Sequence, residues 1–168
     1  MNQRHAVSLG WALLATPWLA LSFPASAERA VILVRHAEKG AEGKDPELTD
    51  SGRQRAVRLA EALKDTGVTT ILTSDARRTI RTAEPAAKAN GVAARVVKGG
   101  DAGETVKEID GAPADAVVLV VGHSNTLPEI LAKLGAPAKV AIADSDFGNL
   151  FVVVRSPGKV PTVVRLRY

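Results

Sequence analysis

The sequence predicts an α/β fold: a three-layer α/β/α sandwich with a mainly parallel central sheet and a C-terminal hairpin. Short apolar runs without polar alternation, which are typical of strands buried on both faces, alternate along the chain with segments of helical periodicity. The last two extended runs flank the turn Ser156-Pro157-Gly158-Lys159, which is typical of an antiparallel hairpin. Alternation of strands with helices favours a parallel sheet covered by helices on both faces.

Six strands are expected, four of them before the hairpin. The four are Ala30–Val34, Thr70–Thr73, Ala94–Val97 and Val117–Val121, and the hairpin strands are Asn149–Arg155 and Val160–Arg167. Ligands of open α/β sheets bind beyond the carboxyl ends of the parallel strands. Functional residues are therefore expected directly after the apolar runs.

The first helix is expected between the first two strands. Its apolar face is formed by Ala56, Leu59, Ala60 and Leu63. Thr49 or Asp50 could cap this helix, and Gly67 could end it.

Three further helices are expected along the chain. A helical pattern runs from about Ala76 to Asn90, and Pro85 predicts a break or kink near Glu84. A short helix covers Glu104–Ile109, and Thr126-Leu127-Pro128-Glu129 has the form of a capping box with proline in the first turn.

The first 27 residues predict a secretory signal peptide, followed by one domain over residues 28–168. Arg4 and His5 form a basic start, Ala6–Phe23 is uncharged, and Ala25-Ser26-Ala27 is a small-x-small cleavage site. An uncleaved membrane anchor is the alternative, since the uncharged run is nearly long enough to span a bilayer. We expect an exported protein, periplasmic or secreted, with no membrane span after cleavage.

The composition excludes several classes of protein. The chain has no cysteine, which excludes disulfides, thiol catalysis and cysteine-ligated zinc. Its formal charge of +4 is spread without a basic block, and only 4% of residues are aromatic, so nucleic-acid binding is not indicated.

Arginine and histidine side chains follow the ends of the predicted strands. Arg35-His36 ends the first strand, Arg78 lies in the segment after the second, and His123 follows the fourth. A single histidine in such a position is more often a hydrogen-bonded structural residue, but two histidines with arginines favour a functional site. A neutral imidazole can attack phosphorus, an arginine binds two phosphate oxygens at once, and a protonated second histidine adds a donor. These residues therefore predict phosphoryl transfer through a histidine.

The segments VRHAEK, TSDARRTIRTAEP and VVGHSNT resemble the three motifs of the histidine phosphatase superfamily, the phosphoglycerate mutase-like group, in its small, minimal branch. The family's Arg-His-Gly motif occurs as Arg35-His36-Ala37, with alanine in place of glycine. The other motif positions are Ser74, Arg78, Thr82 and Ala83, then Gly122 and His123. LTDSGRQRA also resembles the start of the first helix of this group. The resemblance implies that His36 is the phosphorylated nucleophile, that Arg35, Arg78 and His123 form the phosphate pocket, and that no metal or cofactor is needed.

A general acid for the leaving oxygen is less clear from the sequence. By the resemblance it would follow the third strand, where Asp101 and Glu104 lie, but Asp101 would also cap a helix with Glu104 three residues later. Glu38 is another candidate, as an acid or for substrate binding, and could equally pair with a nearby cation. Asn125 could bind substrate or support the turn after Gly122.

Other polar residues have simpler interpretations. Asp144 and Asp146 lie in the loop before the last strands and could reach the mouth of the pocket, although loop carboxylates are usually solvated. Solvated helix faces are expected to carry Arg53, Arg55, Arg58, Arg77 and Arg81.

The sequence thus predicts an exported phosphatase that hydrolyses phosphomonoesters or phosphohistidine-type substrates through a covalent phosphohistidine on His36. The substrate would be a phosphorylated small molecule, glycan or protein, and a missing acid favours weakly basic leaving groups. The alternative is a non-catalytic phosphate-binding module, which Ala37 and the missing acid motif favour. A metal-dependent hydrolase using His36 and His123 is disfavoured, since two neighbouring arginines would repel a cation.

Overall fold

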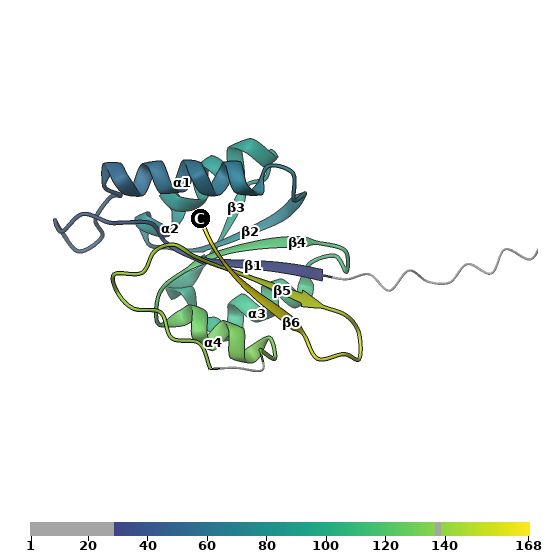
Figure 1. Cartoon of the computed structure of the whole chain (residues 1–168). Helices are drawn as coiled ribbons and strands as arrows, with labels where there is room; N and C mark the ends of the chain where they lie inside the picture. The colour runs from purple at the N-terminus through teal and green to yellow at the C-terminus, as the bar shows by residue number, and fades with distance from the viewer. Residues whose placement is uncertain (1–28, 137–138) are drawn as a thin grey trace, which may run out of the picture.

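The computed structural model describes residues 29–136 and 139–168 as an α/β/α sandwich (Figure 1). Helices α1 (Asp50–Leu63) and α2 (Arg77–Asn90) cover one face of a six-stranded sheet, and α3 (Ala102–Gly111) and α4 (Thr126–Lys133) cover the other. The predicted fold class is confirmed. The predicted signal peptide lies outside the described residues.

The sheet has the strand order β3-β2-β4-β1-β5-β6. Its strands are β1 (Arg29–Arg35), β2 (Val68–Ser74), β3 (Ala94–Val97), β4 (Val117–Gly122), β5 (Asn149–Arg155) and β6 (Thr162–Arg167). The first four run parallel, while β5 pairs antiparallel with both β1 and β6. The sheet is therefore mixed, because the predicted hairpin is itself part of the sheet and extends it beyond β1.

Local sequence signals explain where two of the helices begin. The Thr49 hydroxyl accepts a hydrogen bond from the Gly52 N–H at the start of α1, at 3.1 Å. The Asp101 carboxylate accepts one from the Glu104 N–H at the start of α3, at 2.8 Å. Both residues satisfy N–H groups that have no partner inside the helix.

The predicted break in α2 and the predicted capping box at Thr126 are both absent. Helix α2 continues through Pro85 without a break, because Ala83 and Ala86 on either side of the proline are fully buried in the core beneath α1. This packing offsets the one helical hydrogen bond that proline removes. The predicted capping box at Thr126 does not form: α4 follows Asn125, and the Thr126 hydroxyl accepts from the His123 N–H at 3.1 Å.

A close contact fixes α1 against the segment that follows β1. A Cβ atom on Gly52 would lie 2.2 Å from the carbonyl oxygen of Glu38, so the two backbones touch where only glycine fits. The Thr49 N–H also donates to that carbonyl oxygen, at 3.0 Å. The chain after β1 is therefore held in place by the start of α1.

Across residues 29–136 and 139–168, no helix has the length and apolar character needed to cross a membrane.

Candidate active site

The first and third motifs are joined by backbone pairing at the carboxyl ends of two neighbouring strands. Arg35 at the end of β1 is in register with Gly122 at the end of β4. The His36 N–H continues this pairing by donating to the Gly122 carbonyl oxygen, at 2.9 Å. His36 and His123 consequently lie side by side, with ring centroids 5.3 Å apart and planes at 64°. The two imidazoles are therefore in edge-to-face contact.

His36 has the properties of a neutral nucleophile. Its ring is buried, and Nδ1 lies 2.8 Å from the Ala37 carbonyl oxygen. A carbonyl can only accept, so Nδ1 carries the proton and Nε2 keeps its lone pair. The pKa of His36 is lowered from 6.5 to about 4, chiefly by burial. The hydrogen bond to the Ala37 carbonyl oxygen opposes this shift, and the charges of His123, Arg35 and Arg78 add to it.

His123 is held by a chain of hydroxyl groups from β2 and α2. Its Nε2 lies 3.0 Å from the Ser74 hydroxyl, which lies 2.9 Å from the Thr79 hydroxyl. Burial lowers the pKa of His123 to about 4, followed by the effect of the positive charges of Arg78 and Arg35. Both histidines are therefore neutral at pH 7, and the protonated second histidine expected from the sequence would require an anion beside it.

The Arg35 guanidinium is buried, with one nitrogen held by a distant loop. Its Nη1 donates to the carbonyl oxygens of Ala143, at 2.9 Å, and Asp144, at 2.7 Å. The Phe147 ring lies against the guanidinium, with Cζ 4.2 Å from the ring centroid. Nε is buried without a hydrogen-bond partner among the described residues.

Arg78 lies in the first turn of α2, close to the same group. Its charge contributes to the lowered pKa values of Arg35, His36 and His123, which places it near all three. Its Nε is also buried without a partner in the described part of the chain, and its Nη1 is 3.7 Å from an Asp45 carboxylate oxygen. The structure thus brings together the four residues that the sequence singled out.

The remaining motif positions support the loop that carries His36. The Thr82 hydroxyl accepts from the Ala37 N–H at 2.9 Å and donates to the Arg78 carbonyl oxygen at 2.7 Å. This bridge links the first two motifs. Ala37 is fully buried, and no described residue other than glycine has a positive φ, so alanine occupies the family's glycine position without backbone strain.

Glu38 is bound to a cation outside the histidine pair. Both of its carboxylate oxygens accept from Arg55, the shortest contact being 2.7 Å. The hydrogen bonds from Arg55 hold the pKa of Glu38 below its usual value, so this carboxyl group is ionised and poorly suited to donate a proton. Arg55 was expected on a solvated helix face; instead it is largely buried between Glu38 and the Tyr168 carbonyl oxygen.

The two acid candidates after β3 are both exposed. Asp101 caps α3 through the Glu104 N–H, and the Glu104 carboxylate lies 3.4 Å from Lys107. Asn125 is exposed just before α4, where its side chain caps no backbone group. The capping geometry expected for Asp101 is confirmed.

One of the two loop carboxylates that the sequence placed near the mouth of the pocket lies closer to the site. Asp144 accepts from the Ser124 hydroxyl at 3.0 Å and is 3.8 Å from Arg35 Nη2. Asp146 instead pairs with Arg167, at 2.9 Å, and with Arg165, at 3.7 Å. Within residues 29–136 and 139–168, no three histidine, aspartate or glutamate side chains form a group that could hold a metal ion.

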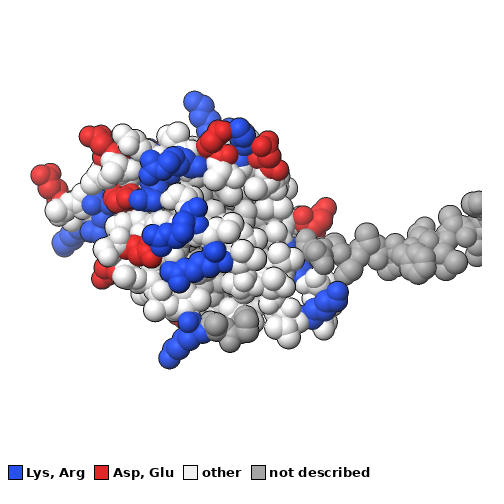
Figure 2. Space-filling model, in the orientation of Figure 1, with Lys and Arg blue, Asp and Glu red and all other residues white. Residues whose placement is uncertain are grey.

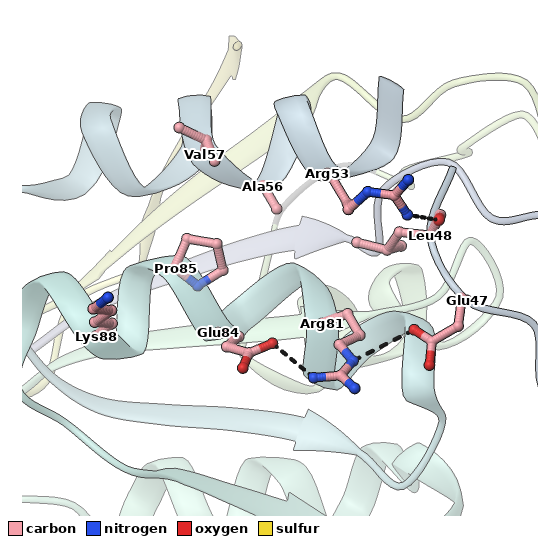
Figure 3. Close-up of a pocket in the computed structure, with 9 residues that line it drawn as sticks. All are labelled: Glu47, Leu48, Arg53, Ala56, Val57, Arg81, Glu84, Pro85 and Lys88. Carbon is pink, nitrogen blue, oxygen red and sulfur yellow. Dashed lines mark hydrogen bonds and ion pairs between the residues drawn. The ribbon is translucent and has the colours of Figure 1, made fainter. Parts of the chain in front are cut away.

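A groove of about 590 Å³ lies elsewhere, between α1 and α2 (Figure 3). Arg81 lines this groove and forms ion pairs with Glu84, at 3.0 Å, and with Glu47, at 3.4 Å. None of the four strand-end residues lines this groove. The cluster of two histidines and two arginines is therefore separate from it.

Comparison with known proteins finds a family whose model resembles part of this chain. Residues 31–99 match the family described as the histidine phosphatase superfamily, branch 1. The histidine phosphatase resemblance is confirmed. The matched range contains the first two motifs, and the structure adds His123 of the third beside them. No curated protein matches the chain.

Solved structures of phosphatases share the fold. The protein histidine phosphatase SixA in complex with tungstate is 18% identical with a TM-score of 0.67, over 82% of this chain and 96% of that one. SixA of Nakamurella multipartitia is 25% identical with a TM-score of 0.60, over 83% and 96%. The mycobacterial glucosyl-3-phosphoglycerate phosphatase Rv2419c is 18% identical with a TM-score of 0.60, over 76% and 90%. Together with the family match, these likenesses support a phosphatase function.

Proposed function

We propose that this histidine phosphatase relative is an exported, metal-independent phosphatase that works through a covalent phosphohistidine on His36. The observation that carries the proposal is the state of His36: a buried, neutral imidazole whose Nδ1 donates to the Ala37 carbonyl, beside two arginines whose Nε atoms have no partner among the described residues. A buried N–H donor without an acceptor destabilises the folded protein, because the group has lost its hydrogen bond to water. A phosphoryl oxygen would satisfy both guanidiniums at once.

The first chemical step forms a bond from His36 Nε2 to phosphorus. The bond from phosphorus to the leaving oxygen or nitrogen breaks, and its electron pair goes to the leaving atom. Arg35, Arg78 and His123 surround the position of the nonbridging oxygens and stabilise the charge that develops there. Nδ1 keeps its proton and its bond to the Ala37 carbonyl oxygen, so the phosphorylated ring is positively charged.

The second step returns the enzyme to its starting state. A water oxygen bonds to phosphorus, the bond from phosphorus to Nε2 breaks, and its electron pair returns to Nε2. The water loses a proton to solvent, and phosphate is released. A positively charged ring is a good leaving group, which favours this hydrolysis.

The substrate class follows from the carboxylates near the site. Glu38 is bound to Arg55, and Asp101 and Glu104 are exposed around the start of α3. Because Glu38 is bound by Arg55 and Asp101 caps α3, neither is free to donate a proton to a leaving group, and substrates with weakly basic leaving groups, such as phosphohistidine or acyl and aryl phosphates, are favoured over alkyl phosphates. On the face that β6 crosses, Lys and Arg side chains are interspersed with Asp and Glu side chains (Figure 2).

A phosphate-binding module without turnover is the second candidate. The binding of Glu38 by Arg55 and the exposure of Asp101 and Glu104 favour it, whereas Ala37, which fits without strain, does not. Binding of vanadate without hydrolysis of any phosphorylated compound would select this candidate.

The test is a screen of the protein against aryl phosphate, acyl phosphate, sugar phosphates and phosphohistidine, with a chelator present throughout. The adjacent residues Arg77 and Arg78 provide a matched pair. Arg78→Ala should lower kcat/KM by on the order of 100-fold, as expected for loss of one oxyanion donor. Arg77→Ala should remain near the parent value, since Arg77 is half exposed and pairs with Glu47. His36→Ala should abolish turnover, and full activity in that variant would refute the mechanism.

A further inference from the structure

The loop before β5 encloses Arg35 on two sides. Backbone carbonyls of Ala143 and Asp144 bind Nη1, and the Phe147 ring covers the guanidinium at 4.2 Å. This loop lies more than a hundred residues from Arg35 in the sequence. None of the three motifs includes it.

These contacts restrict how Arg35 can present itself to an oxyanion. With Nη1 bound to the loop, the other edge is formed by Nε and Nη2. The Nε atom has no partner among the described residues, and Nη2 lies 3.8 Å from a carboxylate oxygen of the exposed Asp144. A guanidinium edge with two nitrogens is the arrangement that binds two phosphate oxygens together. The Phe147 ring sets the plane of this edge, because a guanidinium over an aromatic face is held by both contact and charge.

Phe147 also lies against the nucleophile. Its ring centroid is 5.9 Å from that of His36, with the planes at 54°. One phenyl ring therefore touches both the group proposed to attack phosphorus and the group proposed to bind its oxygens. Cover by an apolar ring keeps water from the His36 imidazole, in keeping with its burial.

We propose that Phe147 is a positioning residue of the phosphate site: its ring fixes the plane of the Arg35 guanidinium and shields the His36 imidazole. This proposal rests on the proposed function, because it assigns an oxyanion to the Arg35 edge. Because Phe147 acts through Arg35, the effect of replacing Phe147 should depend on the arginine being present. It also requires an aromatic ring and not only an apolar side chain.

The experiment measures vanadate binding by calorimetry, which does not depend on turnover. Phe147→Leu should weaken binding by about 3- to 30-fold, the range for losing a cation–π contact. Phe147→Tyr keeps the ring and should stay within about twofold. Phe151→Leu is the matched control, since Phe151 also lies under an arginine, Arg165 at 5.5 Å, but has no ring contact with His36 and no cation–π contact with Arg35 among the described residues. It should leave vanadate affinity unchanged in the folded protein.

A double-mutant cycle then tests whether Phe147 acts through Arg35. In an Arg35→Lys background, Phe147→Leu should have little further effect on vanadate affinity, since lysine has no planar guanidinium. Additive effects, or equal affinities of the leucine and tyrosine variants, would overturn the proposal. If Arg35→Lys does not fold, the comparison of leucine with tyrosine decides alone. Failure of the proposed function gives a different result. If the wild-type protein binds vanadate but hydrolyses no phosphorylated compound, the proposed function fails and the Phe147 test still applies. If the wild-type protein does not bind vanadate, the proposed function and the role of Phe147 are both overturned.

Discussion

Acidification is expected to destabilise the folded protein through its buried histidines. Burial lowers the pKa of His36 from 6.5 to about 4, so between these values the unfolded chain binds a proton that the folded chain does not. Neutral His36 therefore makes its full contribution to the free energy of unfolding above pH 6.5, its pKa in the unfolded chain. This contribution is lost as the pH falls towards about 4, its pKa in the folded protein.

The size of the loss follows from the two pKa values. For one histidine with these values, the free energy of unfolding should fall by about 1.4 kcal/mol at about pH 5.5 and about 2.5 kcal/mol at about pH 4.5. The pKa of His123 is also lowered to about 4 by burial. Because its side chain is partly exposed, we expect a smaller contribution from it.

The assay is urea unfolding of the wild type and His36→Asn at about pH 7.5, 6.5 and 5.5, where carboxylates change charge little. The wild type should lose more stability than the variant, by about 1 kcal/mol or more at the lowest of these values. The difference isolates His36, since both proteins carry the same other groups. Equal pH dependence would refute the reasoning, because His36 would then be as easily protonated in the folded as in the unfolded protein. The case for a neutral nucleophile would fail with it.

Other contacts lead to further predictions. Glu38→Gln should lower the free energy of unfolding in denaturant by about 1–3 kcal/mol, since it breaks a partly buried ion pair with Arg55. Turnover should stay within severalfold of the wild type. Lost turnover with unchanged stability would instead place Glu38 in substrate binding. Gly52→Ala should destabilise by about 2 kcal/mol or more, since the new Cβ would meet the Glu38 carbonyl oxygen. Gly111→Ala, with open space around the new Cβ, should leave the melting temperature unchanged or raise it slightly. Aryl phosphatase activity should survive thorough chelation, and its loss would favour the metal-dependent alternative.

The positions of Arg35, His36 and His123 were accessible from the sequence because they lie at the ends of apolar runs. Parallel strands end at one edge of a sheet, so Arg35-His36 and His123 meet wherever β1 and β4 are neighbours. The strand limits were also close, with Ala94–Val97 and Asn149–Arg155 as predicted. Hydrophobic patterning carries this information locally.

The contacts of single side chains were not accessible in the same way. Nothing near Glu38 in the sequence indicates that Arg55 binds it, because that pair depends on the close approach of α1 at Gly52. Phe147 looks like an ordinary loop aromatic until the fold places it over Arg35. Such pairings depend on how elements pack, which local periodicity does not encode.

The sheet register itself builds the centre of the site. Arg35 pairs with Gly122, and the His36 N–H extends that ladder to the Gly122 carbonyl oxygen. A Cβ at Gly122 would lie 2.8 Å from the Leu127 side chain, so the start of α4 packs directly onto this strand end. A slip of one residue would turn every side chain of β1 to the opposite face of the sheet, which the buried apolar residues on both faces oppose. The same packing that stabilises the fold thus holds the two imidazoles 5.3 Å apart, which sets their positions in advance for the proposed phosphoryl transfer.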